Sequence, residues 1–289
     1  MSASVGVVGS VNLDLVASGV PLPRAGETIT GARFAQHPGG KGANQALAAK
    51  RLGADVVMIG CVGDDALAEP ALALLRQEGV DLSGVMSEIG EATGIALICV
   101  SPEGENQITV ASGANLRVGP SDVAALPRCD AILCQLEIPV PAVEATAKVA
   151  SDRGALLILN LAPAIDVPSS LLKSADVLIV NEVEAAFYGD ALHDRGGFVA
   201  KTLGGEGARL YKFGQEVARV SASKVTPVDT TGAGDTFCGA LAVALGEGQT
   251  PESALRFAVA AGALAVTRPG AQPSLPTRGQ VDALLATTP

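Results

Sequence analysis

Two glycine-rich turns carry the residues best suited to chemistry, and the first is DTTGAGDTF at residues 229–237. Gly232 and Gly234 permit backbone angles that bring successive N–H groups to one point. A helix that begins near Asp235 adds the positive end of its dipole, so the turn indicates an anion-binding site. The alternative is that Asp235 and the threonines only cap the helix, because both residue types are common there.

The second turn is GGKGANQA at residues 39–46, which opens a helical pattern that ends at Gly53. Glycines allow the backbone to approach a small polar ligand closely, and Lys41 and Asn44 supply polar groups at the start of the helix. The alternative is a capping loop with a solvated lysine.

Three further stretches contain polar groups in suggestive places. Asn12 and Asp14 in GSVNLD point the same way along a strand and suit hydroxyl groups, because an amide donates and accepts whereas a carboxylate accepts. Asn181 and Glu184 in NEVE favour a divalent cation near a phosphate, often through water. The alternatives are turn chemistry for the first pair and an exposed helix start for the second.

The loop VTRPGAQPSLP at residues 266–276 follows a helix and is rich in proline and glycine. Its backbone carbonyls lack helical partners and can surround a monovalent cation. The alternative is an ordinary connecting loop.

The elements that must position these residues alternate between strand and helix. Apolar runs that predict strands lie at residues 5–8, 56–61, 131–134, 156–159, 177–180 and 198–200, and helical patterns lie at 43–52, 69–78 and 141–153, with a brief turn at 170–174. Near-continuous apolar strands that alternate with helices predict a parallel sheet covered on both faces.

Polar residues follow each of these six strands. They are Asn12 and Asp14, then Gly63, Asp64 and Asp65, then Gln135 and Glu137, then Asn160, then Asn181 and Glu184, and finally Thr202 and Gly204. Ligands of open α/β sheets bind outside the carboxyl ends of the strands, so we expect one shared site there.

Residues 13–36 and 92–112 interrupt the alternation. The second stretch reads as a β-hairpin around SPEGEN, and both together predict a small antiparallel lid inserted into a single domain of residues 1–289. The alternative is a set of ordinary edge strands. In the helical C-terminal third, Thr250 is expected to cap a helix that starts at Pro251.

The composition narrows the classes of function. The chain has 289 residues, 48% of them hydrophobic, and a net charge of −10 without a basic run, which disfavours nucleic-acid and anionic-membrane surfaces. Five cysteines without CxxC spacing fit a reduced, cytoplasmic compartment. We find no signal peptide or membrane span.

The motifs, taken together and in order, resemble those of the ribokinase-like pfkB family of sugar kinases. DTTGAGDTF and GGKGANQA match the family's two signatures, and GSVNLD, PRAGET, TGIAL, NEVEA, TLGGEG and VTRPGAQPS also occur in the family's order. The resemblance covers essentially the whole chain and implies a three-layer α/β/α fold with a mostly parallel central sheet.

The resemblance also implies a role for each matched residue. Asp235 matches the catalytic base, and the backbone of Gly232, Ala233 and Gly234 matches the anion hole. Positions that hold the sugar are matched by Asn12, Asp14, Gly40, Lys41, Asn44, Glu137 and Asp235. Asn181 and Glu184 match a motif linked to Mg²⁺ and phosphate, and the nucleotide site is matched by Thr202, Gly204, Gly207 and Gly234. A K⁺ site is matched by Asp229, Thr231, Ala265, Arg268, Gly270 and Ser274.

The implied reaction is Mg²⁺–ATP-dependent phosphorylation of D-ribose at O5, with K⁺ as activator and a homodimer formed through the lid. The chain departs from the family pattern at Ala68, Leu161 and Val180, and its segment between Asn181 and Thr202 is short, which predicts a truncated helix beside the nucleotide site.

Three alternatives remain open at this point. The first is another sugar as substrate, namely deoxyribose, fructose or a nucleoside, although 3% aromatic residues disfavour a pocket that stacks a base. A non-catalytic sugar or nucleotide sensor is disfavoured by the intact Asp235. A dehydrogenase is disfavoured because GSVNLD is not a dinucleotide fingerprint.

Overall fold

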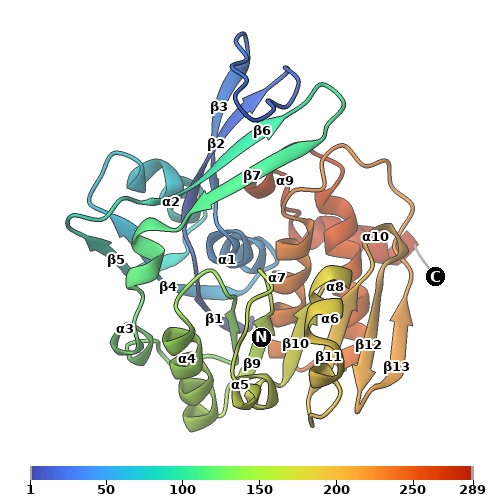
Figure 1. Cartoon of the computed structure of the whole chain (residues 1–289). Helices are drawn as coiled ribbons and strands as arrows, with labels where there is room; N and C mark the ends of the chain where they lie inside the picture. The colour runs from blue at the N-terminus through green and yellow to red at the C-terminus, as the bar shows by residue number, and fades with distance from the viewer. Residues whose placement is uncertain (1, 288–289) are drawn as a thin grey trace.

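A nine-stranded sheet forms the centre of the computed structural model, which describes residues 2–287 (Figure 1). The strand order is β13-β12-β11-β10-β9-β8-β1-β4-β5. The strands are β1 (Ser4–Val8), β4 (Asp55–Gly63), β5 (Asp81–Glu88), β8 (Ala131–Cys134), β9 (Leu156–Asn160), β10 (Val177–Val180), β11 (Phe198–Thr202), β12 (Ala208–Lys212) and β13 (Gln215–Val220). Every neighbouring pair from β11 to β5 is parallel, and only β12 runs against its neighbours.

All six predicted strands are present in this sheet, and the sequence patterns missed its edges. β5 and β13 are the edge strands and contain several exposed residues, and β12 mixes buried and half-buried residues, so none of the three forms a continuous apolar run. β12 and β13 are joined by a tight turn in which Phe213 and Gly214 both have positive φ. These strands form the antiparallel edge of an otherwise parallel sheet.

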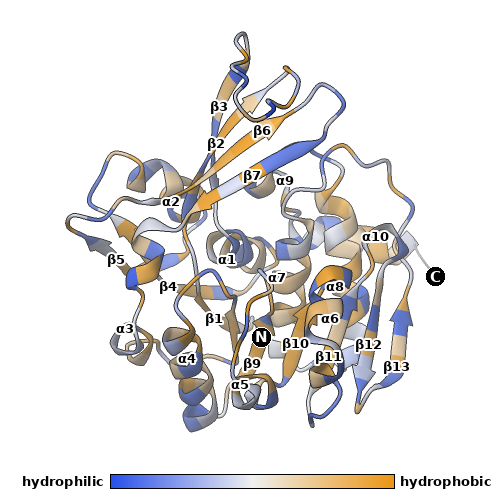
Figure 2. Cartoon of the chain, viewed as in Figure 1, coloured by the Kyte–Doolittle hydropathy of each residue, from blue (hydrophilic) through white to orange (hydrophobic). Residues whose placement is uncertain are grey.

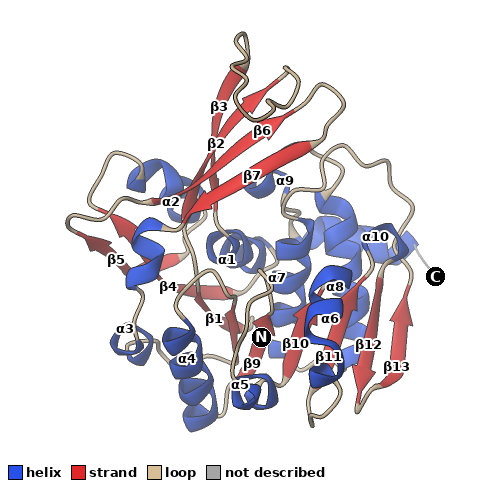
Figure 3. Ribbon diagram, in the orientation of Figure 1, coloured by secondary structure: helices blue, strands red, loops and turns tan. Residues whose placement is uncertain are grey.

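Helices cover both faces of the sheet, as predicted (Figure 3). One face is covered by α1 (Lys41–Arg51), α2 (Ala68–Gln77), α7 (Ala233–Gly246), α8 (Pro251–Ala265) and α10 (Arg278–Thr287), whose apolar residues belong to one core cluster. The other face is covered by α3 (Pro120–Ala124), α4 (Val140–Arg153), α5 (Ser169–Ser174) and α6 (Glu182–Tyr188), which share a second cluster. The short helix α9 (Ala271–Ser274) lies near β3. Thr250 caps α8 at Ser253 N, as expected.

The two interrupting stretches pair as a separate four-stranded sheet in the order β3-β2-β6-β7. Its strands are β2 (Asn12–Ser18), β3 (Arg33–Gly39), β6 (Gly94–Val100) and β7 (Asn106–Ala111). The predicted small antiparallel sheet is present as the hairpins β2–β3 and β6–β7, and the two hairpins join through β2 and β6, which run parallel. β2 follows β1 and β6 follows β5 in the chain. Because β1 and β5 run in the same direction in the main sheet, the two strands that enter the small sheet also run in the same direction.

Apolar residues occur in the strands of both sheets (Figure 2). Strands of the small sheet expose Phe34, Leu97, Ile108 and Val110, each at least 46% accessible. Within residues 2–287, the helices are all too short or too polar to cross a bilayer. All five cysteines lie in the described part of the chain and are free thiols.

Candidate functional site

The site begins where α1 and α7 cross, and glycines allow the two helices to come close. A Cβ at Gly239 of α7 would lie 2.8 Å from the Ala48 Cβ and 2.8 Å from the Gln45 carbonyl oxygen of α1. A Cβ at Gly42 would lie 2.5 Å from the backbone nitrogen of Ser10. Only glycine fits at these approaches. The first turns of both helices are therefore held side by side.

Asp235 lies in the first turn of α7 and is 9% exposed. Its side chain does not cap its own helix, because the N-cap residue is Gly232 without a side-chain cap. Instead Asn44 Nδ2 donates to Asp235 Oδ2 at 2.9 Å, and Gln45 Nε2 donates to Asp235 Oδ1 at 2.9 Å. The alternative of a simple helix cap is wrong for this residue, since its carboxylate faces α1.

Burial raises the pKa of Asp235, and the charge of Lys41 and the two amide donors oppose that rise. Lys41 has a raised pKa, because the carboxylates of Asp235, Glu137 and Glu184 outweigh the effect of burial, which lowers it. Lys41 is half-buried, lines the smaller cavity and lies near these three acidic groups.

Glu137 joins the start of α1 to the end of β8. Its Oε2 accepts from Ser10 Oγ at 2.5 Å and from the Lys41 backbone N–H at 3.1 Å. Gly40 has φ 88°, and a Cβ there would lie 2.7 Å from Asn12 N. The GGKGAN turn thus packs its backbone directly against the first strand of the small sheet.

Asn12 and Asp14 lie on the same face of β2, as the strand alternation predicted. Asn12 is 3% exposed, and its Oδ1 accepts from Asn115 Nδ2 at 2.8 Å. Burial, together with the nearby Glu137 and Asp235, raises the pKa of Asp14 to about 6. Gly39 makes room for this carboxylate, because a Cβ there would lie 2.4 Å from Asp14 Oδ1.

The turn before α7 has the geometry expected of an anion site, with one correction. Gly232 has φ 78°, and a Cβ there would lie 3.0 Å from the Ala271 Cα. A Cβ at Gly234 would meet nothing within 4 Å, so this residue borders open space. The N–H of Ala233, which was expected in the anion hole, instead donates to Thr230 O at 3.3 Å. The open donors of the first turn are then those of Gly234 and Asp235.

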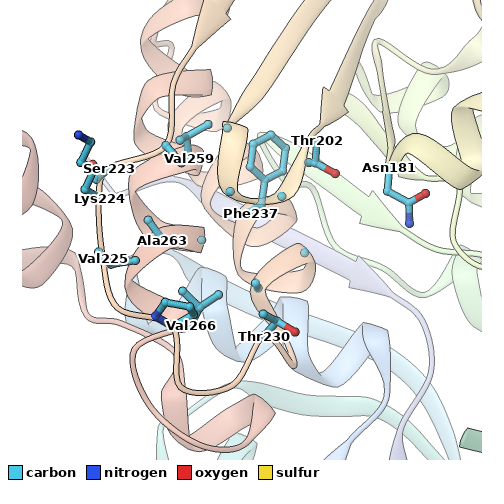
Figure 4. Close-up of a pocket in the computed structure, with 18 of the residues that line it drawn as sticks. Asn181, Thr202, Ser223, Lys224, Val225, Thr230, Phe237, Val259, Ala263 and Val266 are labelled. Carbon is cyan, nitrogen blue, oxygen red and sulfur yellow. The ribbon is translucent and has the colours of Figure 1, made fainter. Parts of the chain in front are cut away.

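Two cavities meet beside this turn. The larger has a volume of about 720 Å³ and contains Thr202, Gly204 and Gly207 in its wall, together with apolar residues of α7 and α8 such as Phe237 and Val259 (Figure 4). The smaller has a volume of about 160 Å³ and is lined by Lys41, Asp235 and Glu184 among others. Three residues line both cavities: Asn181, Thr202 and Gly234.

The NEVE sequence forms a capping box at the start of α6. Asn181 Oδ1 accepts from the Glu184 N–H at 2.8 Å, and Glu184 Oε2 accepts from the Asn181 N–H at 2.7 Å. Burial raises the pKa of Glu184, opposed by the Asn181 N–H and by Lys41. The pair therefore starts α6 as a capping box, but Glu184 is buried, unlike the exposed helix start that was the alternative, and both residues line the smaller cavity.

The two loops matched to a cation site lie together, held by one carboxylate. Asp229 Oδ1 accepts from the N–H and hydroxyl of Thr231 at 2.9 and 2.6 Å, and its Oδ2 accepts from the Gly270 N–H at 2.8 Å. These bonds outweigh burial and lower the pKa of Asp229. Ala265 ends α8, Ser274 is buried in α9, and the Arg268 side chain is exposed, so only its backbone is suited to a cation here.

Not every polar strand end joins the site. Asp65 follows β4, but its carboxylate accepts from the Thr93 N–H at 2.8 Å and from the N–H groups of Leu67 and Ala68. It therefore fixes the start of α2 and the entry to β6, and the expectation that Asp65 shares the cleft was wrong. Asp64 is exposed.

Sequence reasoning missed two residues that contact the predicted ones. Gln45 bonds to Asp235 and follows Asn44 directly, so the helical position in GGKGANQA was its only signal. Asn115 holds Asn12 from a loop that ends in a 3₁₀ turn (Gly113–Arg117), and no local pattern marks it.

Comparison with known proteins gives a consistent family. Residues 2–278 match the pfkB family carbohydrate kinase model. The chain is 40% identical to the ribokinase of Bacillus subtilis, over 97% of this chain and 98% of that protein, and 38% identical to the ribokinase of Haemophilus influenzae, over 96% and 97%. The solved structure of Arabidopsis thaliana ribokinase complexed with ribose and ATP superimposes with a TM-score of 0.91 at 34% identity, covering 100% of both chains.

Proposed function

Because the chain belongs to the pfkB family of carbohydrate kinases, we propose that it transfers the γ-phosphoryl group of ATP to the 5-hydroxyl of D-ribose, giving D-ribose 5-phosphate and ADP. The proposal rests mainly on one observation. The buried carboxylate of Asp235 lines the smaller cavity, and a larger cavity of a size suited to a nucleotide adjoins that cavity. The relatives at 38–40% identity over nearly their full length are ribokinases, which supports ribose as the acceptor.

In this reaction Asp235 accepts the proton of the attacking hydroxyl. Asn44 Nδ2 donates to one of its oxygens, so the carboxylate is already bonded on the side of the GGKGAN turn before the substrate arrives. The N–H groups of Gly234 and Asp235 stabilise charge on the transferred group, aided by the helix dipole. Lys41 adds a positive charge within the same cavity. Phosphoryl transfer depends mainly on such positioning and charge stabilisation.

The sugar hydroxyls are held by Asn12, Asp14, Gly40, Lys41, Asn44 and Glu137. Since Asn12 Oδ1 is already bonded to Asn115, its Nδ2 group is the one left to donate to a hydroxyl. Asp14 and Glu137 accept hydrogen bonds from hydroxyl groups. We propose that the small sheet acts as the lid that excludes water from this site.

ATP occupies the larger cavity. Its apolar wall on α7 and α8 suits the adenine ring, and glycines at 204 and 207 allow the backbone to approach the nucleotide. Asn181 and Thr202 lie at the junction, where the phosphates pass toward Asp235.

The residues present fit both metal ions of the proposal. Among residues 2–287, no three acidic, His or Cys side chains gather as a metal cage, which suits a Mg²⁺ ion held chiefly by phosphates and water with the single carboxylate of Glu184 nearby. Mg²⁺ supplies charge neutralisation on the phosphates when bound. Backbone carbonyls and Asp229 in the two tied loops are hard oxygen ligands, which suit K⁺. We propose Asp229, Thr231, Ala265, Arg268, Gly270 and Ser274 for that ion.

We also propose a homodimer formed through the small sheet. Phe34, Leu97, Ile108 and Val110 expose apolar side chains on it, and β3 and β7 leave unpaired edges, which a second copy would cover. Five free thiols favour a reducing, cytoplasmic setting.

The proposal is tested by measuring ADP release from MgATP with D-ribose, 2-deoxyribose, fructose and nucleosides, with and without K⁺. The expected result is the highest kcat/KM with D-ribose and a further increase with K⁺. A higher value with deoxyribose, fructose or a nucleoside would reassign the acceptor, and binding without turnover on every sugar would identify a sensor instead.

A further inference from the structure

Behind Asp235 lies a set of buried amide side chains that the proposed reaction does not use. Gln45 and Gln135 are 0% exposed and Asn160 is 7% exposed. Gln45 Nε2 donates to Asp235 Oδ1 at 2.9 Å and to Asn160 Oδ1 at 3.2 Å. Gln135 Nε2 donates to Gln45 Oε1 at 2.6 Å. The carboxylate is thus connected through Gln45 to residues at the ends of β8 and β9.

These bonds determine which end of the Gln45 amide faces the carboxylate. Asn160 Nδ2 donates to Ile179 O at 3.4 Å, which leaves its oxygen toward Gln45. Gln135 presents its donor group to Gln45 Oε1. A reversed Gln45 amide would place its oxygen against the oxygens of Asp235 and Asn160 and its N–H₂ group against that of Gln135. Asp235 and Asn160 therefore oppose the reversed orientation, and Gln135 donates to the Gln45 oxygen in the observed one.

The burial of Gln135 is itself informative. Its Oε1 is buried and has no hydrogen-bond partner within residues 2–287. An unpaired buried amide oxygen destabilises a fold, so packing alone would favour an apolar side chain here. The favourable interaction that Gln135 does make is its bond to Gln45.

We propose that Gln45 is a positioning residue for the catalytic base and that Asn160 and Gln135 together hold its amide in the observed orientation. The inference rests on the proposed function, because it assigns Gln45 a role through Asp235. Asn44 holds the Oδ2 atom from the sugar side, whereas Gln45 holds the Oδ1 atom from the protein interior. Gln45 keeps the carboxylate in one plane and stabilises its charged form.

The charged and titratable groups around Asp235 come from several elements and stay in place when Gln45 is replaced. They are Lys41 of α1, Asp14 of β2, Glu137 after β8, Glu184 of α6 and Cys238 of α7. The difference between wild type and a Gln45 variant therefore reports the amide donor and not these groups.

The test compares wild type with Q45M, which keeps the length of the side chain and removes the donor. T146V is the matched control, because Thr146 is equally buried and its hydroxyl donates to Ala142 O on α4, away from the site. We expect Q45M to lower kcat for ribose by about tenfold or more while KM for ribose changes by less than about threefold. The acid limb of the kcat profile should move to higher pH by about one unit, since loss of a donor to the carboxylate raises its pKa. T146V should leave both unchanged.

Q135M is a second variant, which leaves Gln45 in place and removes the donor to its Oε1. It should lower kcat in the same direction and by less. If thermal unfolding shows that Q45M does not fold, the kcat and pH profile of Q135M test the inference in its place. If Q45M and Q135M fold and show wild-type kcat with an unmoved acid limb, the inference about Gln45 is wrong, and the proposed function is unaffected. A wild-type protein that releases no ADP with any sugar would instead refute the proposed function, and this inference with it.

Discussion

The two halves of the site are built in different ways. On the sugar side, Asn12, Asn44, Glu137 and Asp235 are largely buried and already bonded to neighbours within the protein. On the nucleotide side, a cavity of about 720 Å³ is lined mainly by glycines and apolar side chains. Cβ atoms at Gly204 and Gly205 would meet nothing within 4 Å, so this wall presents mostly backbone.

The difference separates two tasks. A bonded, desolvated set of polar groups is oriented before substrate binds, which is what catalysis of proton and phosphoryl transfer requires. A wide, smooth cavity supplies affinity through shape and apolar contact and tolerates change. Substitutions on the sugar side should therefore affect chemistry, and those on the nucleotide side should affect ATP binding or leave activity intact.

The largest effect is expected from D235N, which removes the base and keeps its volume. kcat should fall by about 10³-fold, while KM for ribose changes little, because the proton acceptor is lost and the other sugar contacts remain. Steady-state ADP release measures both values. D152N is the control, since Asp152 is exposed on α4 and pairs only with Lys148 at 2.7 Å among the described ion pairs. Nearly wild-type turnover in D235N would show that another group accepts the proton.

Gly232 and Gly234 lie in the turn between the sugar side and the nucleotide side, and their substitution should separate an effect on stability from an effect on ATP kinetics. G234A should lower kcat/KM for ATP by about 100-fold, because the added methyl enters the open space where the transferred group binds. Its melting temperature should stay the same. G232A should destabilise the fold by about 1–2 kcal/mol, because Gly232 has φ 78° and lies against Ala271. Calorimetry and ATP kinetics are measured on both variants. A destabilised G234A with normal ATP kinetics, or a stable G232A with impaired ATP kinetics, would contradict this assignment.

Asp14 connects function to stability through pH. Its pKa is raised to about 6 in the folded protein from an ordinary 3.8, so its charged form destabilises the fold above about pH 6. This destabilisation disappears as pH falls from about 6 toward 4. D14N should therefore unfold at a higher temperature than wild type at pH 7, and the difference should shrink at pH 4.5.

The same D14N variant should lose about 10- to 100-fold in kcat/KM for ribose, since a charged acceptor for a hydroxyl is removed. Thermal unfolding without ligand at the two pH values measures the first effect, and sugar kinetics measure the second. A stability difference that grows toward low pH would place the pKa shift on another group.

The smallest effect on activity is expected at the shortened segment beside the nucleotide cavity. Arg195 is 5% exposed and its guanidinium donates to the carbonyls of Leu172, Ala175 and Phe198, which ties this segment to α5 and β11. R195M should lower stability by about 1–3 kcal/mol by leaving buried carbonyls unpaired. It should leave kcat and KM for ATP unchanged at 25 °C. A large rise in KM would show that this edge shapes the cavity.

The features that could best be predicted from the sequence are those for which only one type of residue is physically suitable. The buried parallel strands were predictable because both of their faces are apolar, and the turns at Gly39–Gly40 and Gly232 were predictable because close approach and positive φ require glycine. The edge strands β5 and β13, and β12 beside β13, were not, because polar residues interrupt their apolar ones.

Contacts between residues far apart in the chain could not be predicted from the sequence. The bond from Asn115 to Asn12 spans 103 positions, and the bond from Gln45 to Asp235 spans 190, so no local pattern encodes either. The same limit hid the parallel pairing of β2 with β6 and the diversion of Asp65 to Thr93. The short segment after Asn181 was visible in the sequence, but the role of Arg195 as its anchor depends on three carbonyls from other elements.

The most direct test of the account is the identity of the product. The protein is incubated with MgATP and D-ribose, and the phosphorylated sugar is examined by phosphorus and proton NMR. The account predicts one phosphate ester, coupled to the two C5 protons of ribose, formed by wild type and at about one thousandth of that rate by D235N. A phosphate on another oxygen, or equal formation by D235N, would contradict it.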